Sequence, residues 1–147
     1  MQQTYDPRRI ELEMLYSPGV AGQEFLRRLK EEGSLTASRC KKCGATVMPP
    51  RIYCLECFSN DIEFIPIKPR GRIHTYTVAY VDKNGNRLEK PVIYAIISFD
   101  GVKGGITHRV NASPENIRIG MEVEAVFRPS EERRGELSDI IYFEPIH

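Results

Sequence analysis

The chain of 147 residues is long enough for one ordinary domain, or for a small domain plus a mini-domain that a metal stabilises. Its 21 basic and 20 acidic side chains give a net charge of +1, which argues against a dedicated nucleic-acid binder, because such proteins usually carry a basic excess. No apolar run approaches the roughly 18 residues that cross a bilayer, and the first residues, MQQTYDPRRIELEM, lack the apolar core of a signal peptide. We therefore expect a cytoplasmic protein that does not enter a membrane.

Residues 1–33 are expected to form an N-terminal helical segment. Ser17-Pro18 predicts the start of the main helix, with the serine as N-cap and the proline at the first helical position. Gly33 predicts its end, and residues 6–16 are expected to form another short helical piece. The apolar residues that share one face of the main helix are Val20, Phe25, Leu26 and Leu29. This face packs against either the protein's own core or a partner, and the sequence leaves both open.

The four cysteines form two pairs with the same spacing, Cys40-x-x-Cys43 and Cys54-x-x-Cys57. Two residues between the members of a pair let the backbone fold into a knuckle that points both sulfurs at one ion. Only ten residues, 44–53, separate the pairs, which predicts a compact zinc ribbon over residues 34–69. Two disulfides or two redox-active pairs are the alternative, but neither pair lies in a βαβ context and no signal peptide indicates an oxidising compartment.

A site made of four thiolates is closed, so its metal holds a fold together and has no position at which to activate water. Zinc is the expected ion, although iron also accepts four thiolates and the spacing does not separate the two. Gly44 follows the first knuckle, where a left-handed backbone is often needed. Lys41 and Lys42 lie inside that knuckle and would partly offset the negative charge of the site.

Residues 70–147 are expected to be all β. The run Ile62–Ile65 predicts a strand that leads out of the ribbon, and Pro66 and Pro69 mark its boundary. The later strands are expected over 71–82, 91–99, 104–110, 122–127 and 137–143, with one helical turn from Ser113 between the third and the fourth. Five strands in this order predict a five-stranded OB-fold barrel. A β-sandwich is the alternative, but it more typically has about seven strands.

Taken together, these parts resemble a known family: the zinc-ribbon and OB-fold proteins associated with acyl-CoA metabolism. The resemblance covers nearly the whole chain. In the first half of the chain it rests on the helix that ends in Glu32-Gly33, the knuckles Cys40-Lys41-Lys42-Cys43-Gly44 and Cys54-Leu55-Glu56-Cys57, and the intervening Pro49-Pro50-Arg51. In the second half it rests on the segment 71–78, which opens the barrel, and on the late segments 119–123 and 126–129. Leu55 departs from the family, which usually has proline there, but the ligand spacing is intact.

The resemblance implies a mainly β protein with an N-terminal helix, in which a rubredoxin-like zinc ribbon precedes the OB-fold. It also implies an accessory subunit without catalysis of its own. Relatives pair with thiolases, hydroxymethylglutaryl-CoA synthases, hydratases or aldolases that act on CoA thioesters. In archaeal relatives the small protein bridges a thiolase to the synthase, so that an acyl-CoA intermediate passes between them. In some members the barrel is thought to bind the acyl-CoA directly.

The sequence itself contains no catalytic constellation. The histidines are His74, His108 and His147, and the first two fall in expected strands, from which they could meet across the sheet. A histidine base needs a serine, cysteine or lysine within hydrogen-bond reach, and the cysteines are assigned to the metal. Motifs of hydrolases, metalloproteases and P-loop proteins are absent from the sequence. This favours a binding or scaffolding role.

Four cations lie near the expected junction of ribbon and barrel, Arg72 being one of them, and the three candidates for ligand binding are Arg51, Lys68 and Arg70. Coenzyme A carries several phosphate charges, and clefts between small domains are common ligand sites. We therefore treat these residues as candidate contacts for CoA phosphates, against the alternative of an ordinary solvated basic cluster. The competing function is single-stranded nucleic-acid binding, which a zinc ribbon joined to an OB-fold also serves. The nearly neutral charge makes nucleic acid the less expected partner.

Overall fold

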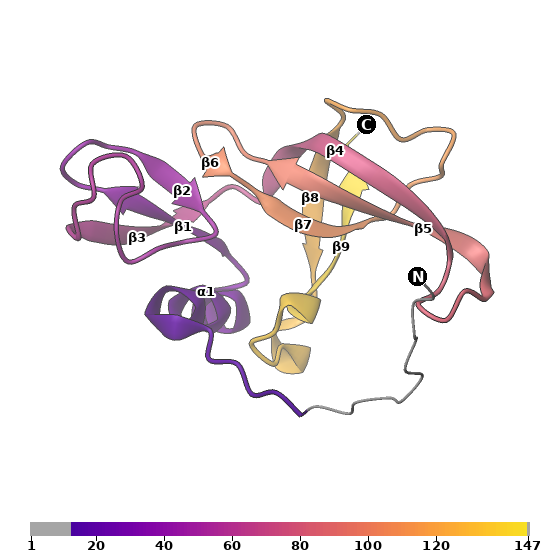
Figure 1. The fold of residues 1–147 in the computed structure, drawn as a ribbon, viewed down its shortest axis with the longest axis horizontal. Helices are drawn as coiled ribbons and strands as arrows, with labels where there is room; N and C mark the ends of the chain where they lie inside the picture. The colour runs from indigo at the N-terminus through magenta and orange to yellow at the C-terminus, as the bar shows by residue number, and fades with distance from the viewer. Residues whose placement is uncertain (1–12, 147) are drawn as a thin grey trace, which may run out of the picture.

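The computed structural model describes residues 13–146, so most of the helical piece expected over 6–16 lies outside the described residues, and residues 13–16 are not helical. Figure 1 shows one helix, a small sheet that carries the cysteine loops, and a closed barrel. The expected fold class, mainly β with an N-terminal helix, a ribbon and a five-stranded barrel, is confirmed.

Helix α1 (Gly19–Glu32) begins one residue later than predicted, with Pro18 rather than Ser17 at the N-cap position. Gly19 has a positive φ of 68°, which breaks the helical path between Pro18 and the helix, although Ser17 Oγ still accepts a hydrogen bond from Gly19 N–H at 3.3 Å. The end is as predicted. Gly33 adopts a φ of 61° and donates its N–H to Leu29 O at 3.1 Å.

The buried face of α1 consists of Ala21, Phe25 and Leu29. Placing Val20 on this face was wrong, because its side chain is 68% exposed. The buried residues are spaced by four, and the residue before Ala21 points about 100° away from that stripe. The helix packs against β1 (Leu35–Cys40) and against two short 3₁₀ turns near the C-terminus, η1 (Ser130–Glu132) and η2 (Leu137–Asp139), which lie beside it in Figure 1.

The ribbon sheet has the strand order β3-β1-β2-β6, in which β2 spans Thr46–Met48, β3 spans Ile62–Ile67 and β6 spans Lys103–Gly104. β3 runs back along β1, from the pair Cys40↔Ile62 to the pair Leu35↔Ile67. It therefore continues past Pro66, where the sequence suggested a boundary. A proline is tolerated there because β3 is an edge strand, and an edge leaves one row of backbone groups without a sheet partner.

β6 joins the two parts of the molecule. It follows the first hairpin of the barrel but pairs in parallel with β2 of the ribbon. Gly104 has a φ of 81°, and a Cβ there would overlap Met48 O, so only glycine fits this approach. Gly105 N–H donates to the same carbonyl oxygen at 3.0 Å. Because β6 belongs to the ribbon sheet while its neighbours in sequence belong to the barrel, the division of the chain into 34–69 and 70–147 stays a prediction.

The barrel closes in the order β4-β5-β7-β9-β8 and back to β4, as an OB-fold requires. Its strands are β4 (Arg70–Val81), β5 (Arg87–Ser98), β7 (Ile106–Val110), β8 (Glu122–Phe127) and β9 (Ile140–Pro145). The expected helical turn after Ser113 is a hydrogen-bonded turn without an assigned helix, in which Asn116 and Ile117 donate to Ser113 O. The expected last strand begins later, because residues 137–139 form η2.

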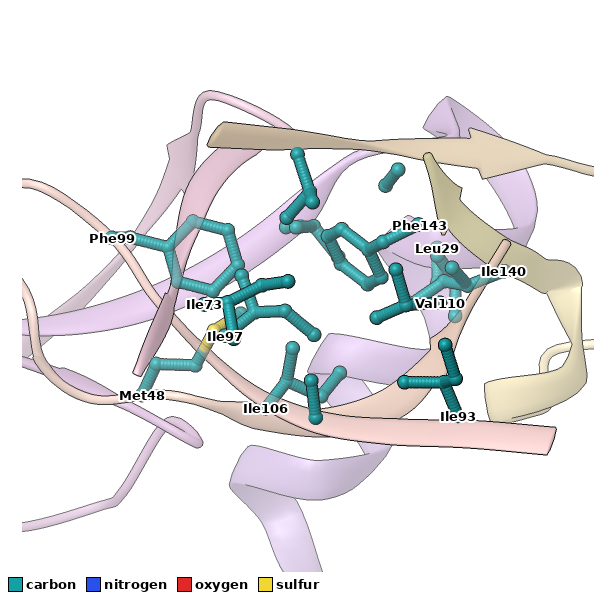
Figure 2. Packing of buried hydrophobic residues seen from close by; sticks show 14 of the residues in the cluster. Leu29, Met48, Ile73, Ile93, Ile97, Phe99, Ile106, Val110, Ile140 and Phe143 are labelled. Atoms are coloured by element: carbon teal, nitrogen blue, oxygen red, sulfur yellow. The ribbon is translucent and has the colours of Figure 1, made fainter. Parts of the chain in front are cut away.

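One continuous core joins α1, the ribbon and the barrel. Leu29 of α1 and Met48 of β2 belong to the same buried cluster as Phe143 in the barrel, as Figure 2 shows. Met48 is only 1% exposed, so the ribbon inserts a side chain into the barrel's core. Ribbon and barrel are therefore packed together as one unit.

The loop before β9 is organised by a fully buried carboxylate, Asp139. Its oxygens accept hydrogen bonds from the backbone N–H groups of Arg134 at 2.9 Å, Gly135 at 2.7 Å and Glu136 at 3.3 Å. Burial by itself raises the pKa of Asp139, but these donors outweigh it and hold the pKa below its ordinary value. The carboxylate thus fixes the segment that supports α1.

We expect Asp139→Asn to lower the free energy of unfolding by roughly 1–3 kcal/mol at pH 7, because an amide cannot accept all of these N–H groups. The deficit should begin to shrink below the ordinary carboxyl pKa of about 4 and be smallest below the lower pKa that Asp139 has in the folded protein, where its carboxylate becomes protonated. Urea denaturation of the variant and the unmodified protein side by side at each pH measures both effects, and since thiolates release zinc in acid, the two proteins are compared in the same metal state. Asp100→Asn, in the exposed hairpin turn, is the control. Equal stability of the two variants would contradict the assigned role.

Candidate functional site

The two cysteine knuckles have the same backbone construction. Gly44 N–H donates to Cys40 O at 2.8 Å in the first, and Phe58 N–H donates to Cys54 O at 3.1 Å in the second. Both donors have a left-handed backbone, with φ of 77° at Gly44 and 57° at Phe58. The first knuckle thus meets the expectation for Gly44, whereas the second places a phenylalanine in a conformation that a side chain disfavours.

The four sulfur atoms converge. Their Sγ atoms all lie within 4.8 Å of one another, with Cys40 and Cys57 at 3.6 Å and Cys43 and Cys54 at 3.5 Å. Sulfurs bound to one zinc ion at about 2.3 Å in a tetrahedron lie about 3.8 Å apart. The residues present therefore fit a four-thiolate metal centre, as the spacing predicted. Free thiols at this separation, rather than disulfides, are what the structure contains.

Backbone donors favour the thiolate form of two of the cysteines, Cys54 and Cys40, whereas the pKa of Cys43 is raised to about 12: the backbone N–H of Ala45 lowers it, but the neighbouring thiols, Cys54 first, outweigh that effect. The N–H groups of Cys57 and Glu56 lower the pKa of Cys54 to about 7, and the N–H of Cys43 is the largest cause of a lowered pKa at Cys40. Glu56 N–H lies 3.4 Å from Cys54 Sγ. A metal ion would supply a structural cross-link here, and all four positions would be protein ligands.

A lysine from the barrel side also approaches this centre. Lys103 in β6 forms an ion pair with Glu56 at 2.6 Å. The pKa of Lys103 is raised, first by Glu56 and also by the charge of Cys43 and Cys54. The sequence suggested Lys41 and Lys42 for charge compensation; Lys41 pairs with Asp61 at 3.5 Å. Lys103 was missed because it comes close only through the pairing of β6 with β2.

The three candidate CoA contacts fall on two different cavities. Lys68 and Arg70 line a cavity of about 420 Å³ at the junction of ribbon and barrel, together with Arg72. Arg70 also lies 3.9 Å from Glu124, while Arg72 pairs with Glu122 at 2.5 Å. The structure thus brings Lys68 and Arg70 together but places Arg51 on another cavity.

This second cavity, of about 830 Å³, lies between α1, the loop that joins the knuckles, and the barrel. Arg51 is its one charged lining residue in the described part of the chain, and most of the others are apolar. We call it the helix groove. Sequence reasoning missed it: Val20 was placed on the same helix face as Phe25 and Leu29, and the apolar pair Ile52-Tyr53, which precedes Cys54, was the one local signal.

The two described histidines, His74 and His108, do not form a site. β5 lies between β4, which carries His74, and β7, which carries His108, so the suggested meeting across the sheet does not occur. His108 Nε2 lies 3.3 Å from Leu137 O, and its ring packs against Phe143. His147 lies outside the described residues. In the part of the chain that the structure describes, no helix has the length and apolar character needed to cross a bilayer.

With the geometry established, known proteins can be compared. The family model described as the rubredoxin-like zinc ribbon domain of ChsH2 matches residues 27–63, and that of the C-terminal OB-fold domain of ChsH2 matches residues 64–128. A DUF35 domain-containing scaffold protein of Methanocaldococcus jannaschii is 35% identical over 69% of this chain and 73% of that protein. The chain therefore belongs to the DUF35 family, whose members join a rubredoxin-like zinc ribbon to an OB-fold.

Other relatives are more distant. Subunit BbsA of the benzoylsuccinyl-CoA thiolase of Geobacter metallireducens is 28% identical over 61% of this chain, which corresponds to 50% of that subunit. A solved DUF35 protein of unknown function from Sulfolobus solfataricus superposes with a TM-score of 0.69 at 27% identity, covering 87% of each chain. A chain of the Ltp2-ChsH2(DUF35) aldolase superposes with a TM-score of 0.62 at 21% identity, covering 84% of this chain and 93% of its own, and shows a shared fold.

We expect the purified protein to contain one zinc ion per chain and to lose its ribbon structure when a strong chelator removes it. Metal binding in four-ligand sites of this kind is worth about 10–16 kcal/mol in small peptides, and that energy supports folding. Cys54→Ser should lower both zinc content and thermal stability, as measured by elemental analysis and calorimetry. Ser59→Ala, next to the second knuckle, should retain the metal. A folded, metal-free protein with four titratable thiols would contradict the assignment.

Proposed function

We propose that this protein is a non-catalytic accessory subunit, located in the cytoplasm, that docks on a thiolase-type or other CoA-thioester enzyme and helps to bind or channel its acyl-CoA intermediate. The observation that carries the proposal is family membership among proteins named as scaffolds, together with a relative named as a thiolase subunit. The site chemistry supports it, because the one metal centre among the described residues has four protein ligands and leaves no position for a substrate.

The ribbon offers a rigid apolar surface for docking. Phe58 is 77% exposed and is held at a φ of 57°, so both its backbone and its ring are in unfavourable positions in the isolated protein. Leu55, three residues earlier in the same knuckle, is also exposed. Strain and exposed apolar area together are typical of surfaces that contact another molecule. We infer that this knuckle packs into an apolar recess of the partner enzyme.

In this proposal the subunit acts by holding the acyl-CoA close to the partner enzyme. Holding an acyl-CoA beside the partner raises its effective concentration at the enzyme's active site and needs no catalytic group. Lys68 and Arg70 would contact the CoA phosphates in the junction cavity, which three cations line, Arg72 being the third, together with the carboxylates of Asp100 and Glu122. The partner would be a thiolase, a hydroxymethylglutaryl-CoA synthase, or a hydratase or aldolase that acts on CoA thioesters.

We expect a tagged copy of the protein, purified from its native cells, to retain a CoA-thioester enzyme through a wash with ~0.5 M salt, which strips most phosphate-backbone contacts. Phe58→Gly should lose the enzyme without losing thermal stability, because glycine adopts a positive φ freely. Tyr80→Ala, which removes an exposed aromatic ring on β4, should keep it.

Two results would oppose this function. One is the absence of any such enzyme from the retained material. The other is nucleic acid eluting in the salt wash with no protein partner, which would favour the OB-fold nucleic-acid function instead.

We expect the double substitution Lys68→Ala and Arg70→Ala to weaken the binding of acetyl-CoA to the isolated protein by roughly tenfold, because two cations near the phosphates are lost. Calorimetric titration at two salt concentrations measures the affinity, and the loss should be larger at low salt. Lys83→Ala with Arg87→Ala removes the same charge from the β4–β5 hairpin and serves as the control. If both double variants bind equally well, the junction cavity is not the phosphate site.

A further inference from the structure

The helix groove has an apolar floor that belongs to the core. Phe25, Met48 and Ile106 line the groove, and each is less than 10% exposed in the folded chain. Around this floor stand apolar side chains that face water. Val20 is 68% exposed, Ile52 54% and Leu137 50%. A volume of about 830 Å³ lies within the range of pockets that hold small molecules, about 300–1,000 Å³.

The wall that faces α1 is fixed before any ligand arrives. Ser38 Oγ accepts a hydrogen bond from Arg51 N–H at 3.0 Å, which fastens the middle of the loop to β1. Pro49 and Pro50 restrict the backbone on one side, and Cys54 ties the other side to the metal centre. A preformed wall lowers the entropy that a ligand must lose on binding.

The opposite wall combines small residues with apolar ones. Gly19, Ala21 and Gly22 of α1 and Gly105 of the barrel leave room between the larger side chains of Val20, Phe25, Leu26 and Ile106. The chain thus leaves space between two rigid surfaces that it does not fill with its own side chains. Unfilled apolar volume of this kind is where an apolar ligand gains most from leaving water.

The charge at the groove indicates which polar group the ligand would carry. Arg51 is the one charged residue in the lining and is exposed. None of the ion pairs formed by residues 13–146 involves Arg51, although Arg70 and Arg72 each have a carboxylate partner. A lone guanidinium beside an apolar hollow is complementary to a molecule with an apolar chain and an anionic group.

We propose that the helix groove binds the acyl chain of an amphiphilic anion, with Arg51 contacting the carboxylate of a fatty acid or, in a CoA thioester, one of its several phosphates, while the others stay with Lys68 and Arg70. That the anion is an acyl-CoA rests on the proposed function, whereas the amphiphilic character of the ligand rests on the groove alone. Free fatty acid and acyl-CoA share this chemistry, and the experiment separates them.

The test is a calorimetric titration of the isolated, zinc-loaded protein with acetyl-CoA, hexanoyl-CoA, decanoyl-CoA and decanoate. We expect the affinity of the CoA thioesters to rise by about two- to fourfold for each methylene that enters the groove. Binding of decanoate as well would show that any anionic carrier serves, and its absence would assign the groove to CoA thioesters. Affinity that does not depend on chain length would overturn the proposal.

Two variants locate the binding. Thr107→Trp fills the groove and should abolish the dependence on chain length, while Thr77→Trp, on an exposed strand position outside the groove, should preserve it. Arg51→Gln should weaken every ligand by about tenfold and leave the increment per methylene unchanged. If Thr107→Trp and Thr77→Trp behave alike, the chain lies elsewhere.

A third variant covers the case in which Thr107→Trp fails to fold. Val20→Glu adds a carboxylate at the lip of the groove on an exposed helix position, so it should keep the fold and repel anionic ligands. Gln23→Glu adds the same charge to α1 outside the groove and should bind normally. Equal binding by both would count against the groove. Because these titrations contain no enzyme, failure of the groove is distinct from failure of the accessory role, which copurification measures.

Discussion

The four-thiolate centre is the constraint on which the other features depend. The ribbon has only three short strands of its own, and the loop between its knuckles contains few residues that could pack a core. Joining Cys40 and Cys43 to Cys54 and Cys57 through one ion would close that loop. The same loop carries Met48 into the common core and Arg51 to the helix groove. Metal binding at the four sulfurs would thus support both the fold and the cavity.

A second set of contacts makes the ribbon and the barrel one body. β6 pairs with β2 where Gly104 passes close to Met48 O, and Lys103 from the same strand reaches the second knuckle through Glu56. On the opposite side, the loop that Asp139 organises supports α1. The strand pairing, the ion pair and the hydrogen bonds of Asp139 are direct contacts between particular residues. They hold the two walls of the helix groove at a fixed separation, which a flexible linker between two domains would not do.

Sequence reasoning succeeded where the signal is local and failed where it arises from packing. Cysteine spacing predicted that the four sulfurs converge, Gly33 predicted the helix end, and strand patterning predicted the OB-fold order, because each depends on residues close in sequence. The exposure of Val20, the approach of Lys103 to the metal centre and the burial of Asp139 depend on contacts between distant segments. For the same reason, proximity in sequence grouped Arg51 with Lys68 and Arg70, whereas the fold turns them toward separate cavities.

The loop from Arg51 to Phe58 connects the two surfaces to which we assign function. Its first residues form a wall of the helix groove, and its last form the apolar knuckle, with the metal ligand Cys54 between them. If an enzyme docks on the knuckle and an acyl chain occupies the groove, both ligands stabilise the same arrangement of this loop. Thermodynamic linkage then requires that each raise the affinity of the protein for the other by the same factor. A subunit built in this way would hold its acyl ligand most tightly when the enzyme is present, which is the behaviour that channelling needs.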